Sequence, residues 1–283
     1  MKDIEYIPIE EKSLNDKLVN LYASKIPGLY SAVKPLFDDP EAIKPALPLL
    51  IELNDDGSYE NADLRVMVFG RETNNWNDKY NRSKYPFGSY NFNLRNSDDI
   101  VTEIMGRHID GEEEYYGLGD IYHGYCYEES GIRKSIFTRR QDQLIQQLAY
   151  RLVNYNIGVV WNNISKISRG GKDFGQCCGK PTPEIREIEC RYFNVVREEV
   201  KILKPDIIIF LTGFYADNDI KEKFGLSDDS FHQIREGLFI DRINIPGVKY
   251  AARTIHPSTR GQRSEYFKTH FEALVDDIIK SLT

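Results

Sequence analysis

Four short apolar runs constrain the fold of this 283-residue chain more than any other feature of its sequence. They comprise residues 64–69, 157–161, 206–211 and 248–255, and each consists mainly of β-branched and aliphatic residues. A strand with one face in water alternates apolar and polar residues, so nearly continuous runs predict strands that are covered on both faces. Strands of this kind are typical of parallel sheets with helices on both sides.

Helical periodicity occupies the stretches around these runs. Apolar residues recur at spacings of three and four in segments 135–153, 183–203 and 261–282, which predicts helices with one apolar stripe each. The alternation of strands and helices predicts an α/β domain on a central, mainly parallel four-stranded sheet. We expect this domain to extend over residues 64–283, with residues 1–63 forming a helical extension packed on it.

Polar residues follow each of the four runs. In open parallel sheets, ligands bind beyond the carboxyl ends of the strands, so these residues are the first candidates for a binding site. Turn formation is the other explanation for each residue taken alone, because Gly, Asn, Thr and Pro are common after strands. The residues at the four ends are Gly70, Arg71 and Glu72; Asn162 and Asn163; Thr212 and Gly213; and His256, Pro257 and Ser258.

Net charge excludes one class of function. The chain carries 37 basic and 44 acidic residues, a formal net charge of -7, which excludes a uniformly basic coat for nucleic acid. Segment 97–130 contains ten acids and one base, and we interpret it as a solvated acidic insertion. Segment 249–270 contains five bases and one acid, so the region around the end of the fourth run is locally positive.

Cysteine content and hydropathy indicate a reducing, aqueous environment. The four cysteines, Cys126, Cys177, Cys178 and Cys190, are too few and too irregularly spaced for a disulfide framework or a metal site. No apolar run approaches the roughly 20 residues that span a bilayer, and segment 1–11 has no apolar signal core. We therefore expect a cytoplasmic protein with no membrane contact, no metal and no cofactor.

The order of the polar strand ends resembles the uracil-DNA glycosylase superfamily. The strongest match is Thr-Ile-His-Pro-Ser at 254–258, which is followed by a helical pattern. The second run ends in Asn163 and continues to Lys166, like the family's strand that ends in Asn. Segment 198–213 reads EEVKILKPDIIIFLTG and is similar to the family's helix, Lys-Pro turn and buried strand ending in Gly. The resemblance covers residues 64–283 and implies a three-layer α/β/α fold.

The first motif departs from the family pattern. The family has Gly-Gln-Asp-Pro-Tyr, Gly-Glu-Ala-Pro-Gly or versions with Asn in the third position, whereas this chain has Gly-Arg-Glu-Thr-Asn at 70–74. The proline is absent, and the third position keeps the carboxylate of one branch. Another branch binds an iron-sulfur cluster through four cysteines, two of them before the first motif. No cysteine precedes Cys126 here, so we expect no cluster.

The resemblance implies roles for the residues at the strand ends. Glu72 would position the attacking water and offset positive charge on the sugar, and His256 would donate a hydrogen bond to the oxygen of the leaving base. Asn163 would pair with the edge of a pyrimidine and reject cytosine, with Gly70 and Arg71 in the same base site. A structural cap, a bridge across a turn and a strand-end turn are the alternative roles of Glu72, His256 and Asn163.

Two loops carry the expected contacts to DNA. Segment 76–92 interleaves aromatic and basic side chains, which suits either stacking on bases or packing of a long loop onto the domain. From this loop, Tyr85 or Phe87 would hold the flipped base. The loop after the His-Pro-Ser motif would contact the backbone or form an ordinary basic surface, with a wedge residue at Arg260. The expected backbone contacts are Arg253, Ser258, Arg260 and Arg263.

The expected function follows from the resemblance. The protein would hydrolyse the N-glycosidic bond of uracil or a related damaged base in DNA. One alternative is the same fold acting on a nucleoside, a nucleotide or another modified base. The other is a non-catalytic binding protein in which the altered first motif has lost activity. DNA is the expected partner, and the default oligomeric state is a monomer.

Overall fold

The computed structural model describes residue 8 and residues 10–72, 118–127, 135–170, 179–259 and 264–282. The chain divides into two compact units, each discontinuous in sequence, whereas the sequence predicted two consecutive regions meeting at residue 63. The helical unit comprises Met1–Glu52, Glu72–Glu128 and Ser165–Ile202. The sheet unit comprises Leu53–Arg71, Glu129–Ile164 and Leu203–Thr283.

The sheet unit contains a six-stranded sheet with the strand order β2-β1-β3-β6-β5-β4. β2, β1, β3 and β6 are parallel, which confirms the four strands predicted from the apolar runs. β4 and β5 extend the sheet in antiparallel orientation beside β6, so the predicted total of four strands is wrong. Strands of three mostly polar residues leave no apolar run in the sequence. The bounds are Leu64–Gly70 (β1), Ile157–Asn163 (β2), Ile207–Phe210 (β3), Phe231–Gln233 (β4), Asp241–Ile243 (β5) and Tyr250–Arg253 (β6).

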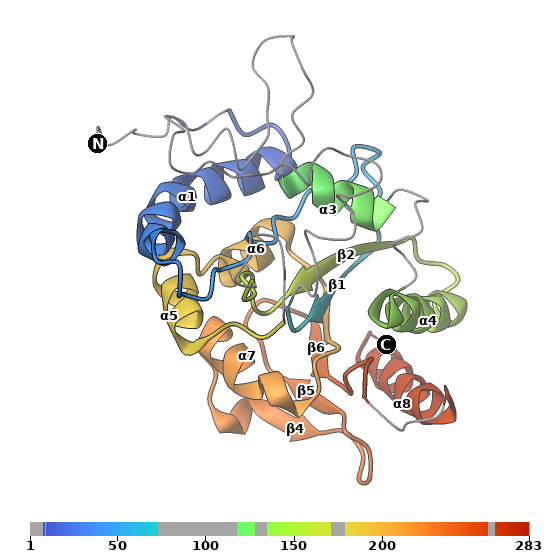
Figure 1. The fold of residues 1–283 in the computed structure, drawn as a ribbon. Coiled ribbons are helices and arrows are strands. Elements are labelled where there is room, and N and C mark those ends of the chain that lie inside the picture. The colour runs from blue at the N-terminus through green and yellow to red at the C-terminus, as the bar shows by residue number, and fades with distance from the viewer. Residues whose placement is uncertain are drawn as a thin grey trace. The chain divides into compact units, whose positions relative to one another are not determined.

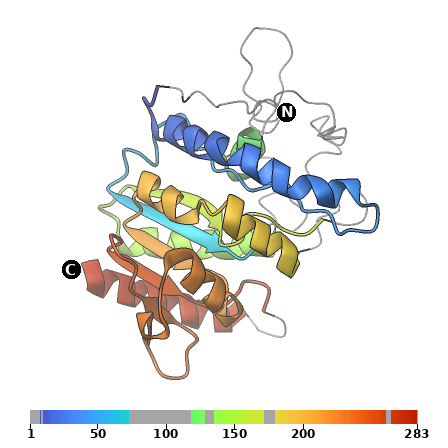
Figure 2. The same ribbon diagram turned by 90° about the vertical axis from the view of Figure 1, so that its left-hand side faces the viewer.

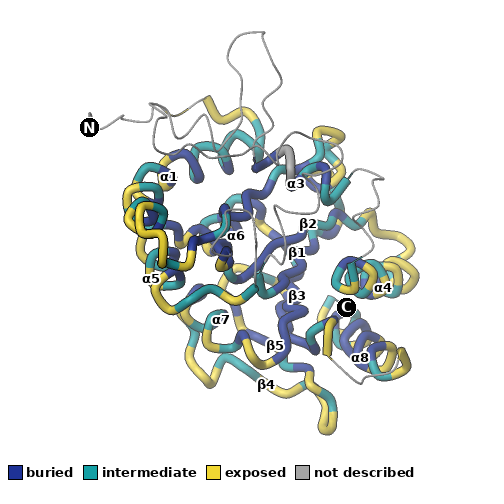
Figure 3. The backbone as a smooth tube through the Cα atoms, viewed as in Figure 1, coloured by how far each residue is buried: buried dark blue, intermediate teal, exposed yellow. Residues whose placement is uncertain are grey.

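One face of the sheet packs on α4 (Ile136–Arg151) and α8 (Ser264–Leu282). Val66 of β1, Leu144 of α4 and Phe271 of α8 belong to the same buried apolar core. Figure 1 shows α4 and α8 side by side, and the two helices contact one another. Figure 3 shows that the exposed surface of these helices points away from buried strands. The apolar stripes predicted for segments 135–153 and 261–282 therefore cover the sheet.

The other face of the sheet packs on α7 (Asp217–Phe224). The rings of Phe69 on β1 and Phe210 on β3 are stacked with their centroids 4.9 Å apart. Phe224 of α7 meets both rings edge-on, at 6.1 and 5.8 Å between centroids. Helices on both faces explain why the parallel strands lack alternating polar residues.

Local capping sets the helix boundaries. α4 begins after Ser135, whose Oγ accepts a hydrogen bond from the N–H of Thr138 at 3.0 Å. The segment predicted as one helix over 183–203 forms two, α5 (Pro183–Tyr192) and α6 (Val196–Leu203). Two apolar residues within the break at residues 193–195 are buried in the core. The spacing of three and four between apolar residues continues through the break, so the sequence pattern shows no interruption.

The helical unit contains α1 (Leu14–Asp38), α3 (Leu118–Tyr127), α5 and α6. α1 packs along α5 (Figure 2), and Gly28 of α1 lies near the ring of Tyr192. Most of the acidic segment 97–130 lies outside the described residues. No helix in the described part of the chain is long and apolar enough to cross a membrane.

A buried ionic network connects elements of the helical unit. Lys166 and Glu199 are both fully buried, and Nζ lies 2.7 Å from Oε1. The hydroxyl of Tyr22 donates to Glu199 Oε1 at 2.6 Å and accepts the N–H of Ile51 at 3.1 Å. Burial, together with the Glu199 charge, raises the pKa of Tyr22 well above its ordinary value. Lys166, part of the Asn-to-Lys motif, is therefore a structural cation.

Candidate functional site

The carboxyl ends of the parallel strands bring four of the singled-out positions to one edge of the sheet unit. Gly70 and Asn163 are the last residues of β1 and β2, Gly213 follows β3, and His256 lies three residues beyond β6. The strand order places β1 and β3 between β2 and β6. At about 4.8 Å per strand, the edge from Asn163 to the end of β6 spans roughly 14 Å.

Asn163 is held tightly against Gly70. The two residues are register partners in the β1–β2 pair, and Asn163 is only 1% exposed. A Cβ added to Gly70 would overlap Asn163 Oδ1 and lie 3.2 Å from the ring of Phe137 on α4. The N–H of Asn163 donates to the side-chain oxygen of Asn162 at 2.8 Å. Glycine at position 70 is therefore required for the observed place of the Asn163 carboxamide.

His256 has a defined tautomer. The backbone N–H of Ser258 donates to His256 Nδ1 at 3.1 Å, and the N–H of Thr259 donates to the His256 carbonyl at 3.0 Å. Because Nδ1 accepts a hydrogen bond, the neutral imidazole carries its proton on Nε2. The turn after β6 thus presents Nε2–H as a donor.

The charge state of His256 is also defined. Burial, and secondly the positive charge of Arg71, lower the pKa of His256 from 6.5 to about 4. At neutral pH the imidazole is therefore uncharged. The Arg71 side chain, predicted from sequence as part of the base site, lies close enough to influence this histidine.

Gly213 allows the loop after β3 to pass against His256. Its φ is +61°, a conformation that residues with side chains rarely adopt. Its N–H donates to the carbonyl of Thr254 at 2.9 Å, and a Cβ at this position would lie 3.4 Å from the backbone nitrogen of His256. The short helix η3 (Phe214–Ala216) therefore starts directly beside His256.

Two aromatic side chains on η3 were missed in the sequence. The rings of Phe214 and Tyr215 are 4.1 Å apart and are 51% and 67% exposed. The guanidinium of Arg71 lies 5.9 Å from the centroid of the Tyr215 ring. The only available signal was a pair of aromatic residues directly after the glycine at the end of the third run.

The other predicted residues have varied positions. Glu72 is half-buried and is the second residue after β1, and Ser258 is exposed in the turn that binds His256 Nδ1. Four predicted residues lie outside the described ranges: Tyr85, Phe87, Arg260 and Arg263.

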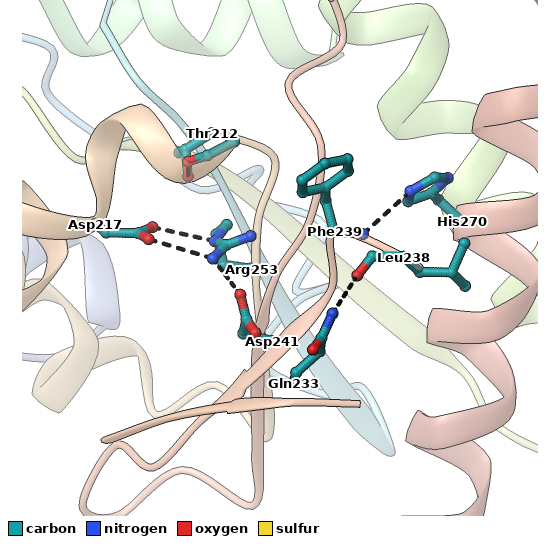
Figure 4. Close-up of polar contacts among 9 residues, drawn as sticks. Thr212, Asp217, Gln233, Leu238, Phe239, Asp241, Arg253 and His270 are labelled. Atoms are coloured by element: carbon teal, nitrogen blue, oxygen red, sulfur yellow. Dashed lines mark hydrogen bonds and ion pairs between the residues drawn. The ribbon is translucent and has the colours of Figure 1, made fainter. Parts of the chain in front are cut away.

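Arg253 requires a correction. Its side chain is 7% exposed and is bound by two carboxylates (Figure 4): Asp217 of α7, at 3.1 and 3.2 Å, and Asp241 of β5. Burial raises the pKa of Asp217, and the charge of Arg253 opposes this effect. Because the side chain is buried and its Nε and Nη2 bind these carboxylates, we remove Arg253 from the expected DNA contacts. Its role is to join α7, β5 and β6.

The comparison with known proteins gives no family assignment. No protein-family model matches the chain, and no curated protein sequence matches it significantly. Among the residues that the structure describes, no group of three or more His, Cys, Asp and Glu side chains is placed to hold a metal ion.

Proposed function

We propose that this protein is a DNA glycosylase-like hydrolase that releases uracil or a related damaged base from DNA, on a three-layer α/β/α fold of the uracil-DNA glycosylase type. The observation that carries the proposal is the hydrogen bond from the N–H of Ser258 to His256 Nδ1. It leaves a neutral imidazole with Nε2–H as a fixed donor, at the edge where parallel sheets bind ligands.

His256 stabilises the leaving base. Cleavage of the bond between the sugar and the base nitrogen leaves negative charge on the base, which concentrates on a carbonyl oxygen of a uracil-like ring. A donor already aimed at that oxygen lowers the barrier without transferring a proton. Loss of one such donor typically costs roughly 100- to 1000-fold in rate. A neutral histidine suffices for this role.

Asn163 selects the base. Its carboxamide has one acceptor and two donor positions, so it pairs with the N–H and the adjacent carbonyl of uracil. Cytosine presents the reverse pattern at the same edge. The fixed place of the carboxamide over Gly70 supports this role, because selection by one side chain needs a defined orientation.

Glu72 acts on the sugar side of the bond. Its carboxylate positions the water whose oxygen bonds to the anomeric carbon, and it offsets the positive charge that develops on the sugar. Its position two residues beyond β1 supports this role. The bond from the anomeric carbon to the base nitrogen breaks as the water oxygen bonds to that carbon. The carboxylate accepts a proton of the water, and the departing base anion takes up a proton, which completes the hydrolysis.

Base release from oligonucleotides tests the proposal. Single-stranded and duplex DNA containing uracil are incubated at low salt with the wild type, Glu72→Ala and His256→Ala. His232→Ala, which removes an exposed histidine on β4, is the control. We expect release by the wild type and the control and a loss of well over tenfold in the two site variants. Absence of release by folded wild-type protein contradicts the proposal.

One observation favours a second candidate substrate. The formal net charge of -7 disfavours accumulated phosphate contacts, so the same site would also suit a free nucleoside or nucleotide. Deoxyuridine and its monophosphate are therefore assayed beside the oligonucleotides. Turnover of the small molecules without turnover of DNA selects this candidate.

A further inference from the structure

The exposed aromatic pair on η3, formed by Phe214 and Tyr215, is not used by the proposed hydrolysis. Both rings keep half or more of their surface in water although they lie 4.1 Å apart. Large apolar side chains in water are unfavourable by about 25 cal/mol for each Å². Two such rings beside a candidate site are typical of a surface that binds a flat apolar group.

The surroundings of the aromatic pair specify the charge of its ligand. The guanidinium of Arg71 lies over the Tyr215 ring, 5.9 Å from its centroid, so a cation adjoins the pair. The next residue after η3, Asp217, is an acid, but its carboxylate is bound to the buried Arg253. A flat ligand that also carries negative charge therefore fits this surface better than a purely apolar or cationic one.

The backbone at Gly213 brings the start of η3 close to His256. Gly213 lies between β3 and η3, and a Cβ added to it would lie 3.4 Å from the backbone nitrogen and 3.5 Å from the Cβ of His256. We therefore expect a group stacked on the pair to lie near the group that receives the hydrogen bond of His256. Neighbouring bases in one strand of nucleic acid are placed in this way.

We propose that Phe214 and Tyr215 stack with an unpaired nucleobase next to the base that His256 contacts, with Arg71 beside the connecting phosphate. This inference rests on the proposed function and names its substrate class as single-stranded or locally unpaired DNA. In a duplex, both faces of each base are already covered by stacking, so no face is free for the pair. Stacking on aromatic side chains is tolerant of sequence, and the neighbouring base can be any of the four.

Binding of short fluorescent oligonucleotides tests this inference. The probes are a single strand with one uracil, the matched duplex, and a single strand of the same length in which all nucleotides except the uracil are abasic. The variants are Phe214→Ala, Tyr215→Ala and the double substitution, with Tyr215→Phe as the conservative variant. The control is Tyr150→Ala, which removes an exposed tyrosine near the end of α4. Because α4 ends shortly before β2 begins, this tyrosine lies toward the amino ends of the strands, opposite the candidate site.

We expect the double variant to weaken binding of the single strand by roughly 5- to 150-fold, the range for loss of one stacked base. Tyr215→Phe and Tyr150→Ala should bind like the wild type. The strand with abasic neighbours should bind weakly to every variant and show no further loss. Since both rings are exposed, the midpoint of thermal unfolding should stay unchanged.

Three outcomes would overturn the inference. These are equal binding by the wild type and the double variant, an equal loss on the strand with abasic neighbours, and tighter binding of the duplex than of the single strand. Binding is measured without turnover, so the two proposals fail separately. Binding that depends on the aromatic pair, without base release, contradicts only the proposed hydrolysis. Base release with unchanged binding by the double variant contradicts only the proposed stacking surface.

Discussion

Protonation of His256 provides the sharpest physical test of the site. Burial and Arg71 lower its pKa from 6.5 to about 4 in the folded protein, whereas the unfolded chain keeps the ordinary value. At about 1.36 kcal/mol for each pKa unit, the difference corresponds to about 3.4 kcal/mol against the imidazolium. The ring is partly exposed, so solvent screening makes this an upper value.

The sign of the effect on stability follows from the order of the two pKa values. As the pH falls through 6.5, the unfolded chain takes up the proton first, so the free energy of unfolding decreases until the folded protein is protonated near about 4. For this histidine alone, the loss reaches about 2 kcal/mol at a pH of about 5. The stabilisation is fully present above 6.5.

Two measurements check this reasoning. Imidazole NMR resonances give the pKa and tautomer of His256 directly. Urea unfolding of the wild type and His256→Asn between neutral and mildly acidic pH gives its contribution to stability. Burial also lowers the pKa of His270, but that residue is common to both proteins and cancels in the comparison. A folded-state pKa of His256 near 6.5, or parallel stability curves, would refute the argument.

Three further substitutions test the structure. Gly70→Ala should displace the Asn163 carboxamide and lower base release by at least about tenfold. The same substitution should destabilise the protein by about 1–3 kcal/mol in urea unfolding. Unchanged activity would exclude a role for the orientation of the Asn163 carboxamide. Glu199→Gln should remove the negative charge that lies 2.7 Å from the buried Lys166 ammonium and cost roughly 3–5 kcal/mol of unfolding free energy. A loss below about 1 kcal/mol would contradict the buried pair. Ser258→Pro should remove the donor to His256 Nδ1 and alter the tautomer seen by NMR, whereas Ser258→Ala, which keeps the N–H, should not.

Regular elements were predictable because their signals are local. The four parallel strands follow from uninterrupted apolar runs, and α4 and α8 from an apolar stripe. β4 and β5 escaped prediction because three mostly polar residues form a strand only when a neighbouring strand offers hydrogen bonds, as β6 does for β5 and β5 does for β4. The segment 183–203 keeps its period through the break between α5 and α6, so periodicity alone cannot place that break.

The site was predictable only in part. The places of His256 and Asn163 could be predicted, since each follows a run that forms a parallel strand of the sheet, and their roles stay predictions. Arg253 was misassigned because its two acidic partners lie 36 and 12 residues away in sequence, and a local count of charges cannot reveal them. The exposure of Phe214 and Tyr215 depends on which segments pack over them in the folded protein. No short sequence pattern gives that information.

The close approach of Asn163 to Gly70 constrains the evolutionary history of this chain. A methyl group at position 70 overlaps the carboxamide oxygen, so a substitution there costs least after position 163 has acquired a shorter side chain. The reverse order passes through an intermediate with a clash in the sheet. In descendants of a common ancestor, the two positions should therefore change in a fixed sequence, with 163 first. A lineage that retains asparagine at 163 should retain glycine at 70, whatever happens to the loops around them.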